Sequence, residues 1–454
     1  MKFKPHPYQK EAIKMLLKEP SSGLFLDPGE GKTSCVLAAL DILKQKGMFK
    51  RALVFATLNI IQLETWQDEI RKWGFSKEFD FSVLHGKGRD LKNISEITLI
   101  NYEGLGWLYE NKRVLKNKFD VLVLDESDQV KSFSAQRFKM FKKIIHLFER
   151  RYILTGTPAP KNLMDLFSQM YLLDEGERLG RYITHYRNEY FNPCGFKGYQ
   201  YDLQEGADDK IHKKIKDIIY RPSKDYLKIP KEKYNDIIIK LPKKVMKQYK
   251  ELEDDYILEV EAGTITAANA GVMSQKLRQV SNGCVYGEGK KPVRIHDYKL
   301  EACKSIVSEL QGNPVLIGYE FRHELDALLK IFPGAPFIGT TLSNKKPTAK
   351  QKNKIKDDWN KGDVPILLGQ ISSIARGLNI QESGHTIILY GHTHHLGDLI
   401  QFIRRLRRQG QKKRVVVHRL ICKGTVDEDI ILSQNAKKKT QDNLLDAMRK
   451  RRLK

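Results

Sequence analysis

The sequence predicts an α/β fold made of two lobes, each with a parallel sheet, joined by a helical linker. Short apolar runs rich in β-branched residues alternate with amphipathic stretches in the first half, as in "RALVFAT" and "VLVLDE", and again in the last third, as in "PVLIGY" and "VVVHRLI". Strands that are apolar along their whole length are typical of parallel sheets covered by helices on both faces. The residues between the two regions are strongly charged, and their pattern predicts helices. We therefore expect a first lobe over residues 1–200, a linker over 201–290 and a second lobe over 291–454.

The composition supports this size and class. A chain of 454 residues with 41% hydrophobic and 30% charged residues is typical of a globular protein with two or three domains. No apolar run approaches the roughly 20 residues that a membrane helix needs, and the N-terminus lacks the apolar core of a signal peptide. The five cysteines form no CxxC pair, which argues against a disulfide framework or a zinc site. We expect a cytoplasmic protein that is not secreted and has no membrane partner.

The charge balance points to a polyanionic partner. The formal net charge is +25, from 80 lysines and arginines against 55 aspartates and glutamates. Nucleic acid is the commonest partner of such a protein, although a role of the charge in solubility alone is an alternative. Charge gives affinity for phosphates without selecting one kind of nucleic acid.

The first motif is a glycine-rich turn between an apolar strand and a helix, "GLFLDPGEGKTSCVLAALDIL". Gly29 and Gly31 allow a tight turn whose backbone N–H groups face phosphate oxygens, Lys32 offsets phosphate charge, and the Thr33 hydroxyl suits Mg²⁺. The following helix points its positive end at the same place. Leu26 stands where the strict GxxxxGK[ST] pattern has its first glycine, so this is the shorter GxGKT form, and a chance loop is the alternative.

An acidic pair follows the next long apolar strand in "FDVLVLDESDQVKS". Asp125 suits a metal ion, directly or through water, and Glu126 suits the orientation or activation of an attacking water. A DE dipeptide alone is weak evidence, but it is strong evidence after a buried strand and downstream of a phosphate loop. The two motifs together predict ATP and Mg²⁺ as cofactors.

Two hydroxyl residues close the next strand, in "RYILTGTPAPKNLMDLF". Thr155 and Thr157 are compact side chains at a strand end beside Gly156, suited to relaying the state of the nucleotide to a bound nucleic-acid strand. A polar turn that merely closes a core strand is the alternative.

Four arginines lie close together in "QFIRRLRRQGQ": Arg404, Arg405, Arg407 and Arg408. The guanidinium group is always charged and can bind a phosphate at two points. The phosphates of a nucleic-acid backbone and those of a nucleotide are both possible ligands, and a solvated basic helix face is the third interpretation.

Nearly end to end, the chain resembles the Swi/Snf-like family of superfamily two helicases and ATP-dependent DNA translocases. The resemblance implies two RecA-like P-loop lobes in a minimal stand-alone form, like those of phages and bacteria. "QFIRRLRRQGQ" followed by "GTVDE" is its most specific match. The other matching segments are "HPYQ", "LETWQDEIRKW", "LINYEGL", "LTGTPAPKNLMDLF", "KLRQVSNG" and "GQISSIARGLNIQESGHTIILY".

The resemblance assigns the arginines to the nucleotide. Aligning Gln401 and Gln411 with the family pattern selects Arg405 and Arg408, which are three apart and would share a face on a helix. In the family such residues are arginine fingers supplied in cis, which stabilise charge in the transition state. Arg404 and Arg407 would then face elsewhere, towards carboxylates or DNA.

The resemblance also implies the remaining site residues. The catalytic set is Lys32, Asp125, Glu126, Arg405 and Arg408. The ATP-binding set is Gln9, Gly29, Glu30, Gly31, Lys32, Thr33, Ser34 and Gly377, with Thr33 and Asp125 as metal ligands. The DNA-binding set is Thr57, Asn101, Tyr102, Thr155, Tyr319 and Ser372.

Two positions depart from the family pattern. Asp128 replaces the usual His or Gln of the acidic box, which changes the side chain available for coupling through that position. Arg221-Pro222 replaces the double arginine of the linker, which affects a contact with the nucleotide or with the hinge.

We expect a monomeric, DNA-dependent ATPase that translocates on duplex DNA and remodels DNA or nucleoprotein in replication, recombination or repair. One alternative is a strand-separating helicase that acts on DNA or RNA, because a separating wedge cannot be recognised in sequence. Another is a nucleic-acid clamp that uses ATP as a switch with little turnover, although the complete set of hydrolysis residues weighs against it.

Overall fold

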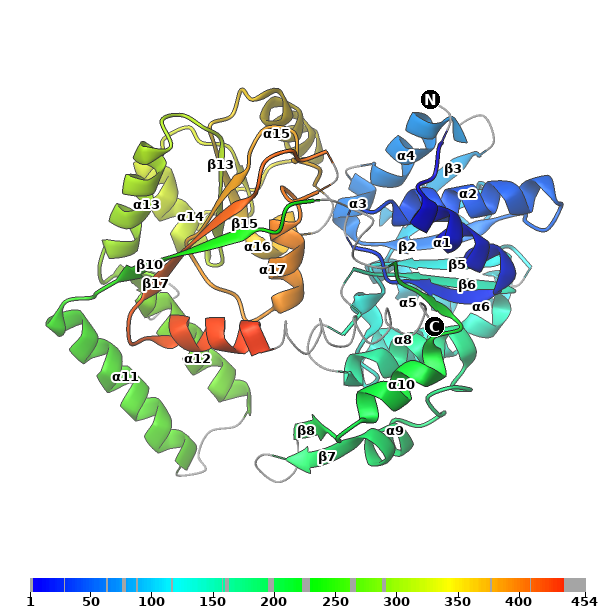
Figure 1. The fold of residues 1–454 in the computed structure, drawn as a ribbon, viewed down its shortest axis with the longest axis horizontal. Helices are drawn as coiled ribbons and strands as arrows, with labels where there is room; N and C mark the ends of the chain where they lie inside the picture. Colours follow the sequence, from blue (N-terminus) through cyan, green and yellow to red (C-terminus); the bar gives the residue numbers. More distant parts are fainter. Residues whose placement is uncertain are drawn as a thin grey trace. The chain divides into compact units, whose positions relative to one another are not determined.

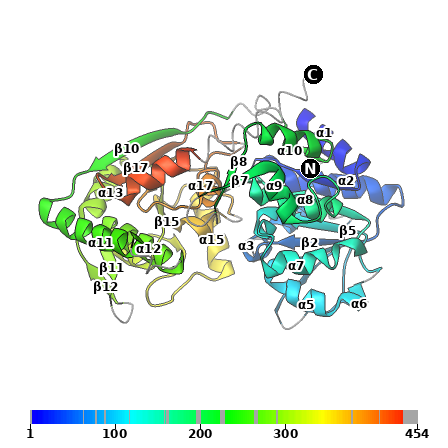
Figure 2. The same ribbon diagram turned by 90° about the horizontal axis from the view of Figure 1, so that it is seen from below.

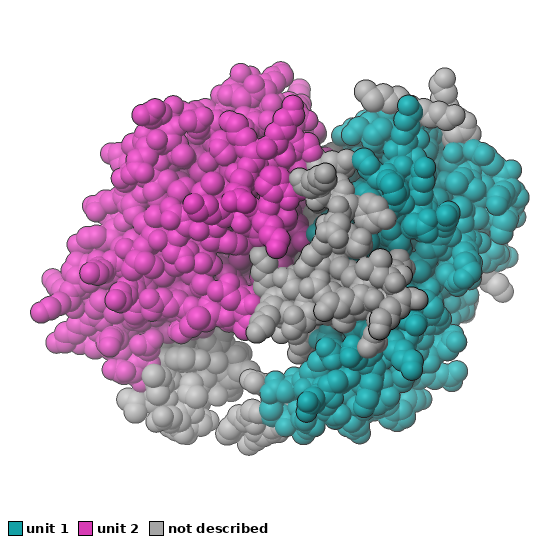
Figure 3. All heavy atoms as spheres, in the orientation of Figure 1, with its two compact units in different colours: residues 1–228, 437–454 teal, residues 229–436 magenta. Residues whose placement is uncertain are grey.

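The computed structural model divides into two compact units, with the boundary between residues 228 and 229 (Figure 3). We call them unit 1 and unit 2, and each is described by itself. The described residues are 3–27, 29–62, 64–75, 79–86, 89–115, 117–156, 158–159, 163–194, 200–222, 229–261, 267–287, 291–375, 378–408 and 410–436.

Unit 1 contains a seven-stranded sheet in the order β3-β4-β2-β5-β6-β1-β9, in which every neighbouring pair is parallel. Its central strands β2, β4 and β5 are buried at every position, as the apolar runs predict. Because the strands are parallel, their carboxyl ends share one edge, so the turns that follow them meet there. The strands are β1 (Ser21–Leu24), β2 (Ala52–Ala56), β3 (Phe81–Leu84), β4 (Ile97–Asn101), β5 (Val121–Asp125), β6 (Arg150–Leu154) and β9 (Ile219–Tyr220).

Helices cover both faces of this sheet (Figures 1 and 2). One core layer is filled by α1 (Pro7–Lys18), α2 (Lys32–Gln45), α3 (Leu58–Gln62) and α4 (Thr65–Trp73). The opposite layer is filled by α5 (Leu105–Glu110), α7 (Gln136–Lys142), α8 (Met164–Asp174), α9 (Ile183–Tyr190) and α10 (Ala207–Ile215). The shorter elements are α6 (Lys112–Leu115), η3 (Tyr102–Gly104), η4 (Ser127–Val130), η5 (Ile145–Leu147) and the hairpin β7 (Phe191–Cys194) with β8 (Gln200–Leu203).

Unit 2 contains a six-stranded parallel sheet in the order β10-β17-β16-β13-β15-β14. The first strand of the unit, β10, pairs along its whole length with the last, β17. Helices α11 and α12 pack against each other beside this sheet (Figures 1 and 2). The strands are β10 (Lys233–Ile239), β13 (Val315–Tyr319), β14 (Phe337–Ile338), β15 (Ile366–Gln370), β16 (Thr386–Leu389), β17 (Val416–Cys422) and the hairpin β11 (Cys284–Tyr286) with β12 (Pro292–Arg294). The helices are α11 (Lys243–Glu261), α12 (Ala267–Ser281), α13 (Tyr298–Glu309), α14 (Arg322–Ile331), α15 (Ala349–Lys361), α16 (Ile371–Ile374) and α17 (Leu396–Ile403).

The predicted fold class, two α/β lobes with parallel sheets, is confirmed. The stretch expected as a linker, residues 201–290, is divided between the units and contains a strand that the sequence did not reveal. Strand β10 lies at the edge of its sheet, where most of its side chains are exposed or half-buried. Its sequence "KYNDIII" is therefore half polar, and it lacks the continuous apolar pattern by which the central strands were recognised. Within the described parts of both units, no helix is long and apolar enough to cross a membrane.

Candidate functional site

The glycine-rich turn connects β1 to α2. Gly29 and Gly31 have φ angles of 89° and 80°, in the left-handed region that glycine adopts without strain. A Cβ atom on Gly31 would also collide with the Gln9 side-chain amide. Helix α2 begins at Lys32, and the N–H groups of a helix's first turn have no acceptor within the helix. The turn therefore offers backbone donors and the positive end of a helix to an anion.

Helix α1 holds this turn in shape. The Tyr8 hydroxyl and the Gln9 amide nitrogen each donate to the Glu30 carbonyl oxygen at 3.0 Å. The Glu30 carboxylate in turn accepts from the Asp27 N–H at 2.6 Å. Gln9 thus lies against the backbone of the turn, and its role in binding ATP stays a prediction.

Lys32 is buried within the turn. Its ammonium group donates to the Leu26 carbonyl oxygen at 3.0 Å and lowers the pKa of Asp125 by its charge. The charge of Lys32 therefore acts directly on the acidic pair.

The acidic pair ends strand β5 and is buried. Only 4% of Asp125 is exposed, and Glu126 follows it with a left-handed φ of 57°. Burial raises the pKa of Asp125 to about 6; the charge of Glu126 adds to this, and the Trp66 and Lys32 contacts oppose it. The Trp66 indole N–H donates to Asp125 Oδ2 at 2.9 Å, and the Tyr102 hydroxyl donates to the Asp125 carbonyl oxygen at 2.9 Å.

The residues present fit a magnesium ion. Asp125 offers a buried carboxylate and Thr33 a half-buried hydroxyl in the first turn of α2. Mg²⁺ prefers oxygen ligands and usually takes one or two carboxylates together with substrate phosphates. Among the described residues, no group of three or more His, Cys, Asp or Glu side chains could hold a metal ion.

Hydrogen bonds connect the acidic box to the segment after β6. The Ser127 hydroxyl donates to Gln169 Oε1 at 2.8 Å, and Gln169 Nε2 donates to the Pro158 carbonyl oxygen at 2.6 Å. Thr155 is fully buried at the end of β6, and Thr157 lies outside the described residues. Gln169 was not predicted from the sequence, where its only signal is its position in helix α8, two residues after the segment "LTGTPAPKNLMDLF".

Two predicted DNA contacts lie side by side at the carboxyl ends of β2 and β4. Ala56 pairs with Asn101, so Thr57 and Asn101 end neighbouring strands. Both residues are buried, yet Thr57 Oγ1 and Asn101 Oδ1 have no hydrogen-bond partner among the residues that the structure describes. A buried polar atom without a partner is costly, so a ligand or water at this edge would satisfy both.

The structure corrects the expectation that Tyr102 and Tyr319 contact DNA directly. Both side chains are buried, and their hydroxyls donate to the carbonyl oxygens of Asp125 and Ile338. Their aromatic rings belong to the hydrophobic cores of units 1 and 2. Ser372 is half-buried in the first turn of α16, which leaves it the more accessible candidate in unit 2.

The arginine run does not continue a helix. Helix α17 ends at Ile403, and residues 404–408 form turns and bends after it, so the expected shared helix face is wrong. Arg405 and Arg408 nevertheless reach the same segment. Arg405 donates to the Ala375 carbonyl oxygen and, at 3.4 Å, to that of Leu378, and Arg408 donates to Asn379 Oδ1. Gly377, expected to contact ATP, lies outside the described residues.

Arg407 points to a different part of unit 2. Its guanidinium group donates to the Pro230 carbonyl oxygen at 2.9 Å and lies 3.3 Å from the Glu232 carboxylate. The contacts of Arg407 therefore differ from those of Arg405 and Arg408, and turns rather than a helix separate them. The predicted division of the run into Arg405 with Arg408 and Arg404 with Arg407 stays a prediction.

The two positions that depart from the family pattern both lie in unit 1. Arg221 follows β9, is buried, and donates to the Phe25 carbonyl oxygen at 3.2 Å; it also lies 3.5 Å from the Asp27 carboxylate. It therefore contacts the strand end that leads into the phosphate turn. Asp128 lies half-buried in η4, directly after the acidic pair.

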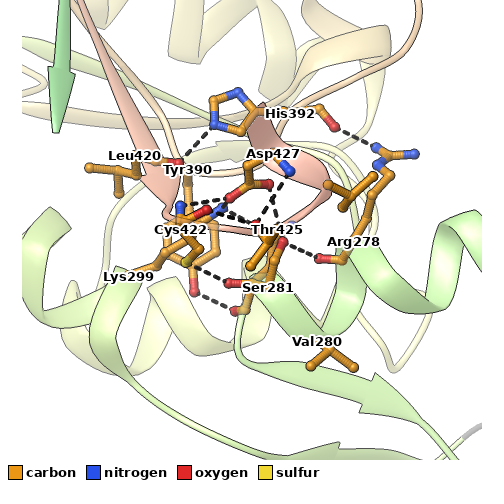
Figure 4. A network of polar contacts seen from close by, with 12 residues as sticks. Arg278, Val280, Ser281, Lys299, Tyr390, His392, Leu420, Cys422, Thr425 and Asp427 are labelled. Atoms are coloured by element: carbon orange, nitrogen blue, oxygen red, sulfur yellow. Dashed lines mark hydrogen bonds and ion pairs between the residues drawn. The ribbon is translucent and has the colours of Figure 1, made fainter. Parts of the chain in front are cut away.

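Two of the matching segments, "KLRQVSNG" and "GTVDE", contribute side chains to a buried polar network in unit 2 (Figure 4). The Lys299 ammonium, which is 0% exposed, lies 2.6 Å from Asp427 Oδ2 and donates to Asn282 Oδ1 at 2.6 Å. Ser281 donates to Asp427 Oδ1 at 3.1 Å. Burial alone would raise the pKa of Asp427, but the adjacent Lys299 charge holds it below the usual value. The two segments therefore stabilise unit 2, a role that was not predicted from their sequence.

We expect Asp427→Asn to destabilise unit 2 by about 3–5 kcal/mol, because the amide leaves the buried Lys299 ammonium without its counter-charge. Urea unfolding of the full chain measures the loss. Asp236→Asn is the matched control, because Asp236 pairs with Arg419 at 2.6 Å but its side chain is 40% exposed. An exposed pair contributes at most about 1 kcal/mol, so equal losses in the two variants would contradict the assignment.

The chain matches two protein-family models over most of its length. The model of the SNF2-related domain matches residues 8–285, and that of the helicase conserved C-terminal domain matches residues 298–410. Protein p41 of Acyrthosiphon pisum secondary endosymbiont phage 1 is 32% identical, with 99% of each chain covered. The DNA repair and recombination protein RAD54-like of Gallus gallus is 22% identical over 97% of this chain and 67% of its own length. The solved Sulfolobus solfataricus SWI2/SNF2 ATPase core in complex with dsDNA is 20% identical, covers 98% of this chain and 95% of that one, and has a TM-score of 0.45.

Proposed function

Because the chain belongs to the SNF2-related family and is an ATP hydrolase of that family, we propose that it is a DNA-dependent ATPase that translocates on double-stranded DNA. Its work would be to remodel DNA or nucleoprotein during replication, recombination or repair. The observation that carries the proposal is the buried pair Asp125 and Glu126, on which the charge of Lys32 acts. The glycine turn that precedes Lys32 offers backbone N–H groups to an anion.

The site residues take the following roles in this proposal. Lys32 and the backbone of the glycine turn bind the phosphates, while Thr33 and Asp125 hold Mg²⁺, which offsets phosphate charge when bound. Glu126 orients the attacking water. Arg405 and Arg408 supply positive charge to the transition state.

The remaining proposed contacts to ATP lie around the same turn. Gln9 holds the turn through Glu30, and Ser34 follows Thr33 in the first turn of α2. Gly377 lies outside the described residues, and its contact with ATP is proposed from the family resemblance alone.

The DNA track is proposed from charge and from the strand ends. A net charge of +25 gives affinity for a phosphate backbone. Thr57 and Asn101, whose side-chain oxygen atoms have no hydrogen-bond partner among the described residues, are the proposed contacts in unit 1. Ser372 is the proposed contact in unit 2. Thr155 is fully buried, so we propose that it acts through its neighbours.

Steady-state ATPase assays with duplex DNA, single-stranded DNA, RNA and no nucleic acid test the proposal. We expect duplex DNA to stimulate hydrolysis most, because the proposed track is a duplex. Release of a labelled third strand from a triplex reports translocation, and release of one strand from a forked duplex reports strand separation. Greater stimulation by RNA or single strands, or strand release from the fork, would favour a strand-separating helicase. A rate that no nucleic acid raises would favour an ATP-switched clamp.

The same assays at different salt concentrations test the backbone contact. Each phosphate that the protein neutralises releases condensed counterions, so for about six contacts the duplex affinity should fall on the order of a thousandfold between about 50 and 200 mM salt. An affinity that hardly changes would contradict the proposed role of the positive charge.

A further inference from the structure

Helix α4 makes two side-chain contacts with the nucleotide site. Trp66, which is fully buried, donates its indole N–H to Asp125 Oδ2 at 2.9 Å. Glu69 accepts a hydrogen bond from the Ser34 hydroxyl at 2.6 Å. Residues three apart on a helix lie on the same side. One side of α4 therefore contacts both the end of β5 and the first turn of α2.

We propose that Trp66 and Glu69 are positioning residues for the magnesium ion, through which α4 fixes the Asp125 carboxylate relative to the first turn of α2. The inference rests on the proposed roles of Asp125 and Thr33 as metal ligands. Thr33 directly precedes Ser34 in α2, so the contact that holds Ser34 also holds the turn that presents the Thr33 hydroxyl.

The chemistry of the Trp66 contact suits this role. An indole N–H donates one hydrogen bond and carries no charge. It fixes the orientation of the carboxylate and leaves its negative charge to a cation, whereas a lysine or arginine at the same place would compete with the metal. The backbone of Asp125 is fixed separately, because its carbonyl oxygen accepts from Tyr102. Partners of this kind, behind the ligands themselves, typically change metal affinity by about 10–100-fold.

Glu69 is itself held in place. Its Oε2 atom accepts from the Trp73 indole N–H at 2.6 Å as well as from Ser34. Both bonds need an acceptor oxygen and neither needs a full charge. Glutamine should therefore preserve the contact, and leucine, which has similar bulk, should abolish it.

The test measures the Mg²⁺ dependence of nucleotide binding, using a fluorescent ATP analogue titrated in EDTA and at increasing Mg²⁺. Trp66→Phe keeps most of the ring volume and removes the donor. We expect it to raise the Mg²⁺ concentration for half-maximal binding by about tenfold or more, with the affinity in EDTA unchanged. Glu69→Leu should shift the Mg²⁺ dependence in the same direction, and Glu69→Gln should restore it.

Trp359→Phe is the matched control. Trp359 is also fully buried and donates its indole N–H, to the Ile380 carbonyl oxygen at 2.8 Å, but it lies in unit 2. It should lower the melting temperature without changing the Mg²⁺ dependence. If Trp66→Phe and Glu69→Leu also leave the Mg²⁺ dependence unchanged, the positioning role is overturned and the contacts are only structural. A wild-type protein whose nucleotide binding does not depend on Mg²⁺ would overturn the proposed metal site, and with it this inference.

Discussion

Replacing Lys32 with alanine should reduce ATP hydrolysis by about a hundred- to a thousandfold or more while leaving unit 1 folded. Removing one preorganised contact to developing charge typically costs that much. The fold should survive because α2 is anchored by its apolar residues, which fill one core layer of the unit. The side chain of Lys32 contributes a hydrogen bond to the Leu26 carbonyl oxygen and a positive charge beside Asp125.

The measurement is the ATPase rate at saturating duplex DNA, with circular dichroism as the check on folding. Lys44→Ala is the matched control, because Lys44 lies in the last turn of the same helix and pairs with Glu96 at 2.8 Å. It should keep nearly full activity. If Lys32→Ala keeps a tenth of the wild-type rate, the glycine turn is not the phosphate site.

Arg405→Ala and Arg408→Ala should each lower DNA-stimulated ATPase activity by about a thousandfold, the usual scale for an arginine finger. Nucleotide and duplex affinity should change little, because the glycine turn lies in unit 1 and the arginines lie in unit 2. Arg405→Ala should also destabilise unit 2, since the Ala375 and Leu378 carbonyl oxygens lose their donor. Lysine should rescue poorly at either position, because an ammonium group cannot make the planar two-point contact.

Arg407→Ala is the control within the same run. Its contacts are to Pro230 and Glu232 and not to the carbonyl oxygens that Arg405 contacts, so the ATPase rate of this variant should stay within severalfold of wild type. If Arg407→Ala instead shows the thousandfold loss and Arg408→Ala is silent, the register taken from the family pattern is wrong by one residue. If all three variants lose duplex binding but keep their ATPase activity, the arginines bind the phosphate backbone of DNA and not the nucleotide.

The parts of the site that the sequence predicted well are local. Each of these features lies within a few residues of a strongly apolar strand: the glycine turn, Lys32 and the acidic pair. The sequence pattern alone therefore places them at strand ends. The contact partners of these residues could not be predicted in the same way. Trp66 meets Asp125 across 59 positions of the chain, and Arg405 meets Ala375 across 30. Only the folded sheet order brings these residues together.

The incorrect predictions have related causes. Tyr102 and Tyr319 follow the strand-end pattern of contact residues, but both rings are buried in hydrophobic cores that residues from distant parts of the chain complete. The end of α17 was missed because the arginines that follow it have good helix propensity. Propensity is a weak guide where side chains instead reach carbonyl oxygens of a distant segment, as Arg405 does.

The buried network of unit 2 also sets the order in which the chain acquires its structure during synthesis. The hydrogen bond from Ser281 to Asp427 cannot form until Asp427 has been made, 146 residues later. At about 5–20 residues per second, a ribosome needs roughly 7 to 30 seconds to make that stretch. Strand β10 likewise cannot pair before β17 is made, because β17 is its neighbour among the described strands of the sheet. Unit 1, by contrast, has every strand of its large sheet once residue 220 has been made. The nascent chain can therefore complete the sheet that carries the glycine turn before the sheet of unit 2, which is incomplete until β17 has been made.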